Sequence, residues 1–366
     1  MCRQPLIIGA GPAGCAAAIA LASRGHPPVV VERSTGPTDK VCGDFLGADT
    51  IARAQALGVD AVGLGAVAIS HVRLVHGRRE TESPLPFPAL SLSRRVFDQA
   101  LLDAAKRAGS ELLGGQTVRL VTRTGEGWAV TLGGPPAESR LAGTIFLATG
   151  KHDLRDRPRP RNAKTAVGLK QYLHLSDRAR VLLGEATELT LFPGGYAGLQ
   201  PVEASRTALC IAVRRDTFQS HGGTWDQLLA EICRLCPRFA ALLTESRPIL
   251  PKPLAVAGVP YGFLHRRTDD GVFRLGDQAA VIPSLTGDGL AIALHSGRLA
   301  AETWMAGGDA HRFHTVLHQA LAGQMRLSGA LHAAFLSPLF QPLVLRAAAI
   351  PGLVRQAALL TRVGSG

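Results

Sequence analysis

The chain has 366 residues, of which 46% are apolar, and its 40 Lys and Arg residues exceed its 28 Asp and Glu residues by 12. This length and composition exclude a disordered chain and predict two intimately joined domains around a large core. The basic residues are scattered, aromatic residues make up 5%, and no zinc-finger or RNA-binding signature occurs, so we expect no nucleic-acid partner. The positive charge fits a solvated surface, an anionic membrane face or an acidic carrier protein.

Cysteine usage indicates a reducing compartment. The six cysteines are irregularly spaced, which fits free thiols and a cytoplasmic protein. Cys233 and Cys236 form a C-x-x-C pair, but no second pair and no His lies near it in the sequence. We therefore predict a helix with two small buried thiols here, and no metal site.

Residues 6–15 contain a short apolar strand followed by a Gly-rich turn. An Ala-rich helix and a second apolar strand come next. In this β-α-β pattern Gly9 would allow the tight turn, Gly11 would let the backbone approach a pyrophosphate, and Gly14 would let helix and strand pack closely. Glu32 comes 18 residues after Gly14 (32 − 14), close to the spacing expected for an acid that hydrogen-bonds a ribose. The unit predicts dinucleotide binding.

The next segments are expected to complete this domain. A loop at 38–47 mixes Lys, Cys, Asp and glycines, and it can either wrap a cofactor or serve as an ordinary connection. The later elements are predicted as a helix at 49–57, two strands within 66–83, a turn at Pro84, Pro86 and Pro88, a helix from 91 to 108, a hairpin of 118–122 and 128–132, and a parallel strand within 141–150. That strand ends at Gly150, which would lie beside the nucleotide.

After a Pro/Arg-rich linker that ends at residue 161, the pattern changes to short apolar runs separated by turns. These runs predict an antiparallel sheet, one face of which could roof a ligand. They lie at 167–175, 180–183, 188–192, 196–200 and 208–213, and a helix is expected at 225–243.

A second Gly-rich turn between strand and helix then appears at 281–290. The strand before it ends near Asp277, whose carboxylate is placed to accept hydrogen bonds from a polyol. Two such turns far apart in the chain can hold two parts of one large cofactor through backbone amides.

Three separated motifs now occur in the order found in one superfamily. They are Gly9 to Gly14 with Glu32-Arg33, then Arg94-x-x-Phe97-Asp98, and last Gly276-Asp277 followed by Pro283 and Gly287-Asp288-Gly289. Over residues 5–305 the chain thus resembles the FAD-dependent oxidoreductases of the aromatic-hydroxylase (group A flavin monooxygenase) and geranylgeranyl-reductase superfamily. Cys42-Gly43 resembles the reductase-like branch in particular.

The resemblance implies an α/β fold with a Rossmann-like FAD-binding domain of the glutathione-reductase type. An antiparallel-sheet substrate domain would be inserted into it, and a helical segment would end the chain. The expected limits are 1–65, 89–160 and 255–305 for the FAD-binding domain, 66–88 and 161–254 for the substrate domain, and 306–366 for the C-terminal helices.

The same resemblance implies which residues hold FAD. Glu32 would bind the adenosine ribose, Val118 would pair with adenine through its backbone, and Arg94 would reach the diphosphate or ribityl side. Asp277 would bind the ribityl chain. The full expected set is Gly9, Gly11, Pro12, Ala13, Gly14, Glu32, Arg33, Cys42, Gly43, Arg94, Val118, Gly150, Gly276, Asp277, Pro283, Gly287, Gly289 and Leu290.

Departures from the family motifs bear on the reaction. Where related hydroxylases have Asp-Gly, this chain has Lys151-His152 after Thr149-Gly150, and of the Tyr-x-Trp-x-Phe-Pro element of prenyl reductases only Phe192-Pro193 remains. We expect an FAD-dependent monooxygenase that hydroxylates a hydrophobic phenolic or alkyl-aromatic compound, with NADPH, NADH or a reduced electron carrier as donor. The alternatives are a reductase of a carbon-carbon double bond in a prenyl-like lipid and a non-catalytic flavin-binding protein.

Side chains in the predicted sheet, together with Asp44 of the loop at 38–47, are the candidates for substrate binding and proton transfer. An apolar wall opened by glycines is expected at Phe192, Gly195 and Leu199. Asp44, His174 and Tyr196 are the proton-transfer candidates, and each could instead be a structural hydrogen-bonding residue.

The tail, residues 311–362, is rich in Leu and Ala and contains interspersed arginines. None of its stretches reaches the roughly 20 apolar residues that a membrane span needs. Helices that cap the substrate domain are favoured over basic amphipathic helices that rest on a membrane. A monomer or a homodimer is expected.

Overall fold

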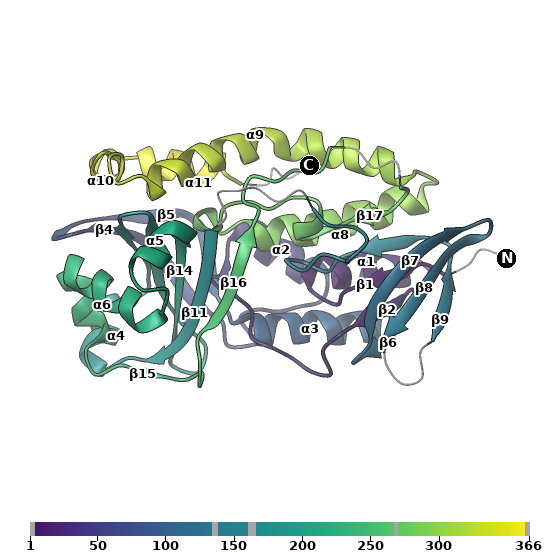
Figure 1. Cartoon of the computed structure of the whole chain (residues 1–366), viewed down its shortest axis with the longest axis horizontal. Helices are drawn as coiled ribbons and strands as arrows, with labels where there is room; N and C mark the ends of the chain where they lie inside the picture. The colour runs from purple at the N-terminus through teal and green to yellow at the C-terminus, as the bar shows by residue number, and fades with distance from the viewer. Residues whose placement is uncertain (1–3, 134–137, 160–165, 267–269, 363–366) are drawn as a thin grey trace.

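The computed structural model describes residues 4–133, 138–159, 166–266 and 270–362. A five-stranded sheet with its helices occupies one end of the molecule and a nine-stranded sheet the other, while the C-terminal helices lie along one side of both (Figure 1). The predicted α/β architecture is confirmed.

The five-stranded sheet is entirely parallel, and its strand order is β17-β10-β1-β2-β6. Its central strand pairs Leu6 with Ile145 on one side and with Val29 on the other. The strands are β17 (Phe273–Arg274), β10 (Ile145–Leu147), β1 (Leu6–Ile8), β2 (Val29–Glu32) and β6 (Glu111–Gly114).

Both faces of this sheet are covered, which explains its continuous apolar strands. Ile7 and Val30 face the helical layer, whereas Leu6 and Ile8 pack against a small antiparallel sheet on the other side. The helices are α1 (Pro12–Ala22), α2 (Ala48–Ala56), α3 (Arg94–Arg107) and α8 (Gly289–Met305), and the small sheet contains β7 (Thr117–Thr124), β8 (Gly127–Gly133) and β9 (Ser139–Ala142). The predicted hairpin and returning strand are therefore confirmed.

The nine-stranded sheet has the order β15-β11-β14-β13-β12-β4-β5-β3, and β16 also pairs with β11. Its neighbours are antiparallel except for β12 and β4, which are parallel. The strands are β3 (Phe45–Leu46), β4 (Val67–His76), β5 (Arg79–Ser91), β11 (Ala166–His174), β12 (Ala186–Phe192), β13 (Gly195–Val202), β14 (Arg206–Arg214), β15 (Arg247–Pro248) and β16 (Leu254–Val259). β16 crosses the expected domain limit at residue 254.

Two local predictions were wrong. Pro84, Pro86 and Pro88 do not form a turn but lie within β5. Proline is tolerated there because β3 pairs with β5 only at Leu90 and Ser91, so the preceding edge is open. Residues 180–183 belong to helix α4 (Asp177–Leu183), whose N-cap Ser176 accepts a hydrogen bond from Ala179 N–H.

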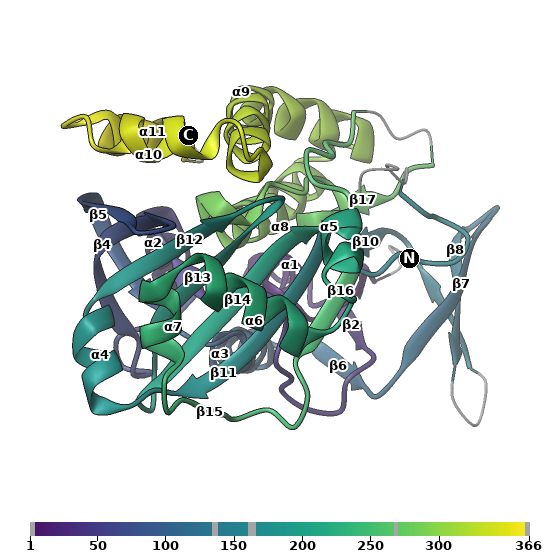
Figure 2. The same ribbon diagram turned by 60° about the vertical axis from the view of Figure 1, so that its left-hand side comes forward.

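Helices cover the nine-stranded sheet on both faces (Figure 2). One face packs against α4, α6 (Trp225–Leu235) and α7 (Pro237–Leu243). One continuous helix was expected at 225–243, but Pro237 begins a new helix and so separates α7 from α6. The other face packs against the C-terminal helices, which are α9 (Ala310–Leu336), α10 (Gln341–Ala348) and α11 (Leu353–Leu360). The remaining helix, α5 (Arg215–Ser220), follows β14.

Candidate active site

A cavity of about 1500 Å³ runs from the carboxyl ends of β1 and β2 to the sheet face that the C-terminal helices cover. Ligands of open parallel sheets bind at this end of the strands. Most residues expected to hold FAD line the cavity, namely Gly9, Gly11, Pro12, Ala13, Glu32, Arg33, Cys42, Gly43, Arg94, Val118, Gly150, Gly276, Asp277, Gly287, Gly289 and Leu290. Gly14 and Pro283 do not line it.

The N-terminus of α1 is open toward this cavity. Gly11 is its N-cap, makes no side-chain cap hydrogen bond, and is followed by a first turn without an acidic residue. A Cβ added at Gly11 would meet nothing within 4 Å, so the space belongs to the cavity. Free backbone N–H groups and the helix dipole make such an end a binding site for an anionic group.

Two other glycines of the motif serve the packing around this turn. Gly9 has a φ of +105°, and a Cβ there would lie 2.5 Å from the carbonyl oxygen of Ala148. At Gly14 an added Cβ would come within 1.9 Å of the Gly9 carbonyl oxygen. Gly14 therefore supports the site through close helix-to-strand packing, as predicted from its spacing, and not through contact with the cavity.

Glu32 stands at the end of β2 with both carboxylate oxygens oriented by the backbone. Oε2 accepts a hydrogen bond of 2.9 Å from the N–H of Ala10, and Oε1 accepts one of 3.0 Å from the N–H of Ser34. Because the carboxylate also lines the cavity, it is positioned to accept hydrogen bonds from ribose hydroxyls.

A second helix N-terminus faces the same cavity at the start of α8. Asp288 is the N-cap without a side-chain cap hydrogen bond, and a Cβ on Gly289 would meet nothing within 4 Å. The preceding Gly287 has a φ of +71°, and a Cβ there would lie 2.6 Å from the ring of Phe45. A side chain at this glycine would therefore clash, and the tight turn keeps the cavity open.

These features fit FAD. One cavity has two uncapped helix N-termini, at Gly11 and Gly289, and an oriented carboxylate at Glu32. The first end suits the pyrophosphate, the carboxylate suits the adenosine ribose, and the turn at Gly287 suits the flavin ring.

The apolar substrate wall was predicted on the wrong face of the sheet. Phe192, Gly195 and Leu199 do not line the cavity; Phe192 and Leu199 are buried in the core beneath α4, α6 and α7. A Cβ on Gly195 would lie 2.4 Å from the Phe192 ring, so this glycine serves packing. Successive strand residues point to opposite faces, and the cavity is lined by the alternate set: Thr187, Leu189, Tyr196, Gly198 and Gln200.

Two of the three proton-transfer candidates also lie away from the cavity. His174 is exposed at the end of β11, opposite Arg247 of β15. Asp44 is fully buried with a φ of +60°, and it is not a lining residue. Of the three, Tyr196 alone lines the cavity.

Asp44 instead joins the loop at 38–47, part of which lines the cavity, to the nine-stranded sheet. Its Oδ2 lies 2.5 Å from Lys170 Nζ and accepts a hydrogen bond of 2.7 Å from the Tyr172 hydroxyl. Burial disfavours the ammonium, but the Asp44 carboxylate beside it raises the pKa of Lys170, so the pair is ionic at neutral pH. Oδ1 accepts a longer bond of 3.3 Å from the N–H of Arg94.

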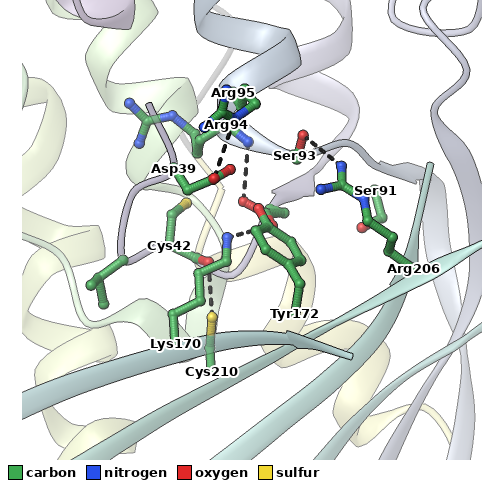
Figure 3. Close-up of polar contacts among 12 residues, drawn as sticks. Asp39, Cys42, Ser91, Ser93, Arg94, Arg95, Lys170, Tyr172, Arg206 and Cys210 are labelled. Carbon is green, nitrogen blue, oxygen red and sulfur yellow. Dashed lines mark hydrogen bonds and ion pairs between the residues drawn. The ribbon is translucent and has the colours of Figure 1, made fainter. Parts of the chain in front are cut away.

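Figure 3 shows Lys170, Tyr172 and Cys210 projecting from the sheet toward Cys42 and Arg94. The Cys210 thiol donates to the carbonyl oxygen of Cys42 at 2.9 Å. Arg94 is held by two hydrogen bonds to Asp98, at 2.7 and 2.8 Å. The Cys210 bond and the contacts of Asp44 fix the loop at 38–47, which was predicted either to wrap a cofactor or to be an ordinary connection.

Three hydroxyl groups meet where the nine-stranded sheet approaches the Gly287 turn. The Tyr196 hydroxyl lies 2.7 Å from Ser284 Oγ, and the Tyr261 hydroxyl donates to the same oxygen at 3.2 Å. Ser284 and Tyr261 line the cavity with Tyr196. Sequence reasoning missed both, although the position of Ser284 three residues before Gly287 was a usable signal.

The end of the chain supplies another wall of the cavity that was not predicted. Arg362 pairs with Asp288 at 2.6 Å and donates to the Thr286 carbonyl oxygen at 3.1 Å. Its guanidinium also lies 4.2 Å from the centre of the Phe87 ring. The C-terminal segment is thereby fixed across the turn that begins α8.

Comparison with known proteins supports FAD binding by the N-terminal part of the chain. Residues 3–132 match a family model described as an FAD binding domain. The menaquinone reductase of Mycolicibacterium smegmatis is 25% identical over 316 residues, covering 83% of this chain and 76% of that protein. Digeranylgeranylglycerophospholipid reductase 2 of Methanopyrus kandleri is 26% identical over 309 residues, covering 81% of this chain and 75% of that protein.

The structure of the flavin-dependent brominase Bmp2 superposes with a TM-score of 0.81 at 17% identity, covering 99% of this chain and 93% of that one. This likeness concerns the fold. Residues 3–132 therefore form an FAD binding domain, and the motifs, the cavity and the comparisons together identify the chain as an FAD-dependent oxidoreductase that is similar to these reductases.

Proposed function

We propose that this protein is an FAD-dependent reductase that saturates a carbon-carbon double bond in a long apolar, prenyl-type substrate. Sequence reasoning placed this reaction second to hydroxylation. The observation that carries the proposal is the shape of the cavity beyond the Gly287 turn, which continues as an apolar sleeve between the nine-stranded sheet and the C-terminal helices. The sleeve residues are Val72, Leu74, Leu85, Leu189, Leu331, Phe335, Val344, Ala347, Ala348, Val354, Ala357 and Ala358.

A sleeve of this kind favours a chain-like substrate over a compact phenol. Each buried methylene contributes about 0.8 kcal/mol, so a long apolar chain gains affinity along the whole wall. The two relatives above support the same substrate class, since one is named as a reductase of menaquinone and the other as a reductase of a digeranylgeranylglycerophospholipid.

Saturation of a double bond adds a hydride to one carbon and a proton to the other. FAD, when bound and reduced by NADPH, NADH or a reduced electron carrier, supplies the hydride. The chain supplies the proton, and the Tyr196 hydroxyl is our candidate donor because it lies in the cavity beside the Gly287 turn. Burial raises the pKa of Tyr196, so its phenol keeps its proton throughout the neutral range.

Replacement of this hydroxyl should affect turnover more than binding. Tyr196→Phe is expected to lower kcat about 100-fold, the lower end of the range for general acid catalysis, while KM and flavin absorbance change little. Tyr261→Phe is the matched control, because Tyr261 bonds to the same Ser284 oxygen. Equal losses of kcat in both variants would contradict a specific role for Tyr196.

A larger side chain in the sleeve should discriminate against long substrates. Gly198 lines the cavity, and an added Cβ would meet only Leu189 Cδ2 at 3.3 Å and the Cys210 carbonyl oxygen at 3.8 Å. Gly198→Leu should exclude about two methylene groups and raise KM for long substrates about tenfold. Kinetics with a series of chain lengths would measure this change, and an unaltered KM at every length would place the substrate elsewhere.

An anaerobic half-reaction tests the proposed function. The FAD-loaded protein is reduced chemically without oxygen, and a geranylgeranyl lipid, which has no quinone ring that could oxidise the flavin, is added. We expect the oxidised flavin spectrum to return and the product to gain two hydrogen atoms. The proposal fails if the flavin stays reduced in this experiment. If, in a separate aerobic assay, oxygen is also consumed on substrate addition and one oxygen atom enters the product, the protein is the hydroxylase first expected.

A further inference from the structure

The C-terminal helices expose an unusual amount of apolar surface. Of the twelve large apolar side chains exposed in the part of the chain that the structure describes, seven lie within residues 339–360. We call these seven the C-terminal apolar face, and they are Leu339, Phe340, Leu343, Ile350, Leu353, Leu359 and Leu360. Leu339 is 83% exposed and Leu360 is 68% exposed, whereas burial of such residues is the norm.

The charge of the same segment is of one sign. No Asp or Glu follows Asp309, while Arg346 on α10 and Arg355 on α11 are both exposed. A surface that combines exposed Leu and Phe with arginines and lacks carboxylates is complementary to an anionic lipid interface.

The inner side of these two helices belongs to the cavity. Val344 and Ala348 of α10 and Val354 and Ala358 of α11 line the apolar sleeve. Leu353 is both a lining residue and a member of the C-terminal apolar face, being 39% exposed. A wall of the cavity therefore lies directly beside the exposed face.

The helices suit an interfacial position. Within the described residues no single helix is long and apolar enough to cross a bilayer. The consecutive helices α9 and α10 together would be long and apolar enough, but they are bent by 116° relative to each other. In Figure 2 α10 and α11 lie at one edge of the molecule, outside the nine-stranded sheet. Helices of this length and composition lie in the plane of an interface.

We propose that the C-terminal apolar face docks the protein onto an anionic bilayer. Leu339, Phe340 and Leu360 enter the interface while Arg346 and Arg355 contact lipid phosphates. Docking brings the sleeve next to the lipid, so that an apolar molecule can pass from the bilayer into the cavity without crossing water. The docking itself does not depend on which reaction the flavin performs.

Vesicle co-sedimentation of the FAD-loaded protein tests this proposal. The wild type should sediment with vesicles of phosphatidylcholine and phosphatidylglycerol, bind much less to phosphatidylcholine alone, and dissociate in high salt. Leu339→Glu/Leu360→Glu should abolish sedimentation. Arg346→Gln/Arg355→Gln should weaken it about 25-fold, or about fivefold for each arginine. Neither pair contains a residue that lines the cavity, so the flavin spectrum should remain that of the wild type.

Val181→Glu is the matched control, because Val181 is 84% exposed but lies on α4, across the sheet from the C-terminal helices. It should bind vesicles as the wild type does. Sedimentation of Leu339→Glu/Leu360→Glu at the wild-type level would overturn the proposal. So would a wild type that ignores anionic vesicles and instead forms a dimer that this double variant dissociates, since the face would then be covered by a second copy.

Discussion

Gly11→Leu should abolish FAD binding while leaving the protein folded. The backbone at Gly11 has a φ of −75°, which any residue can adopt, and no atom lies within 4 Å of an added Cβ. The new side chain would therefore stand in the cavity and keep a pyrophosphate away from the free N–H groups of α1. The loss of two hydrogen bonds to a charged group costs roughly 3–6 kcal/mol, which lowers affinity at least about 100-fold.

Absorbance of the purified protein, followed by titration with FAD, measures this effect. Gly14→Leu provides the contrast, because its Cβ would overlap the Gly9 carbonyl oxygen at 1.9 Å and disturb the fold itself. We expect circular dichroism to stay native for Gly11→Leu and to change for Gly14→Leu. Retention of stoichiometric flavin by Gly11→Leu would show that the pyrophosphate binds elsewhere.

Lys170→Met should destabilise the protein by roughly 3–5 kcal/mol, because it leaves the carboxylate of Asp44 buried without its cation. Both side chains of the pair are fully buried, and they join the loop at 38–47 to β11. Chemical denaturation at pH 7 would measure the loss. A change under 1 kcal/mol would mean that the pair contributes little to holding the loop.

The double variant Asp44→Asn/Lys170→Met should recover most of this stability, because no unpaired charge remains. Asn is chosen since residue 44 has a φ of +60°, which Asn tolerates better than an aliphatic residue. Burial raises the pKa of Asp44 even though Lys170 lowers it, so removal of the lysine should raise this pKa further. A carboxyl pKa that is raised in the folded state means that stability present at low pH is lost as the pH rises through that pKa. The loss of stability in Lys170→Met relative to the wild type should therefore be smaller near pH 4 than at pH 7.

The sequence predicted best where one local backbone requirement decides the structure. The β-α-β unit needs a tight turn, an open helix end and an acid at a strand end, and all three are encoded within thirty residues. These needs fix the spacing of Gly9, Gly11, Gly14 and Glu32. For the same reason the Gly287 turn was found, and its φ of +71° is one that favours glycine. These residues needed no information about distant parts of the chain.

Prediction failed where two distant segments must be placed relative to each other. Alternation along β13 was evident, but which of its two faces meets the cavity depends on where the C-terminal helices pack. The choice of Gly195 and Leu199 over Gly198 was therefore undetermined by the strand itself. Ser284 and Tyr196 are 88 residues apart, and the contact between them depends on how the two sheets approach each other.

The position of Arg362 constrains the order in which the walls of the cavity can form while the chain is being synthesised. The cavity has walls from residues 8 to 362, and the pair between Arg362 and Asp288 fastens the last of them. Residue 362 is synthesised 351 residues after Gly11 (362 − 11), long after the β-α-β unit that contains Gly11 has emerged from the ribosome. The nascent chain can therefore present a pyrophosphate site early, whereas the cavity wall that Arg362 fastens can form only after residue 362 has emerged.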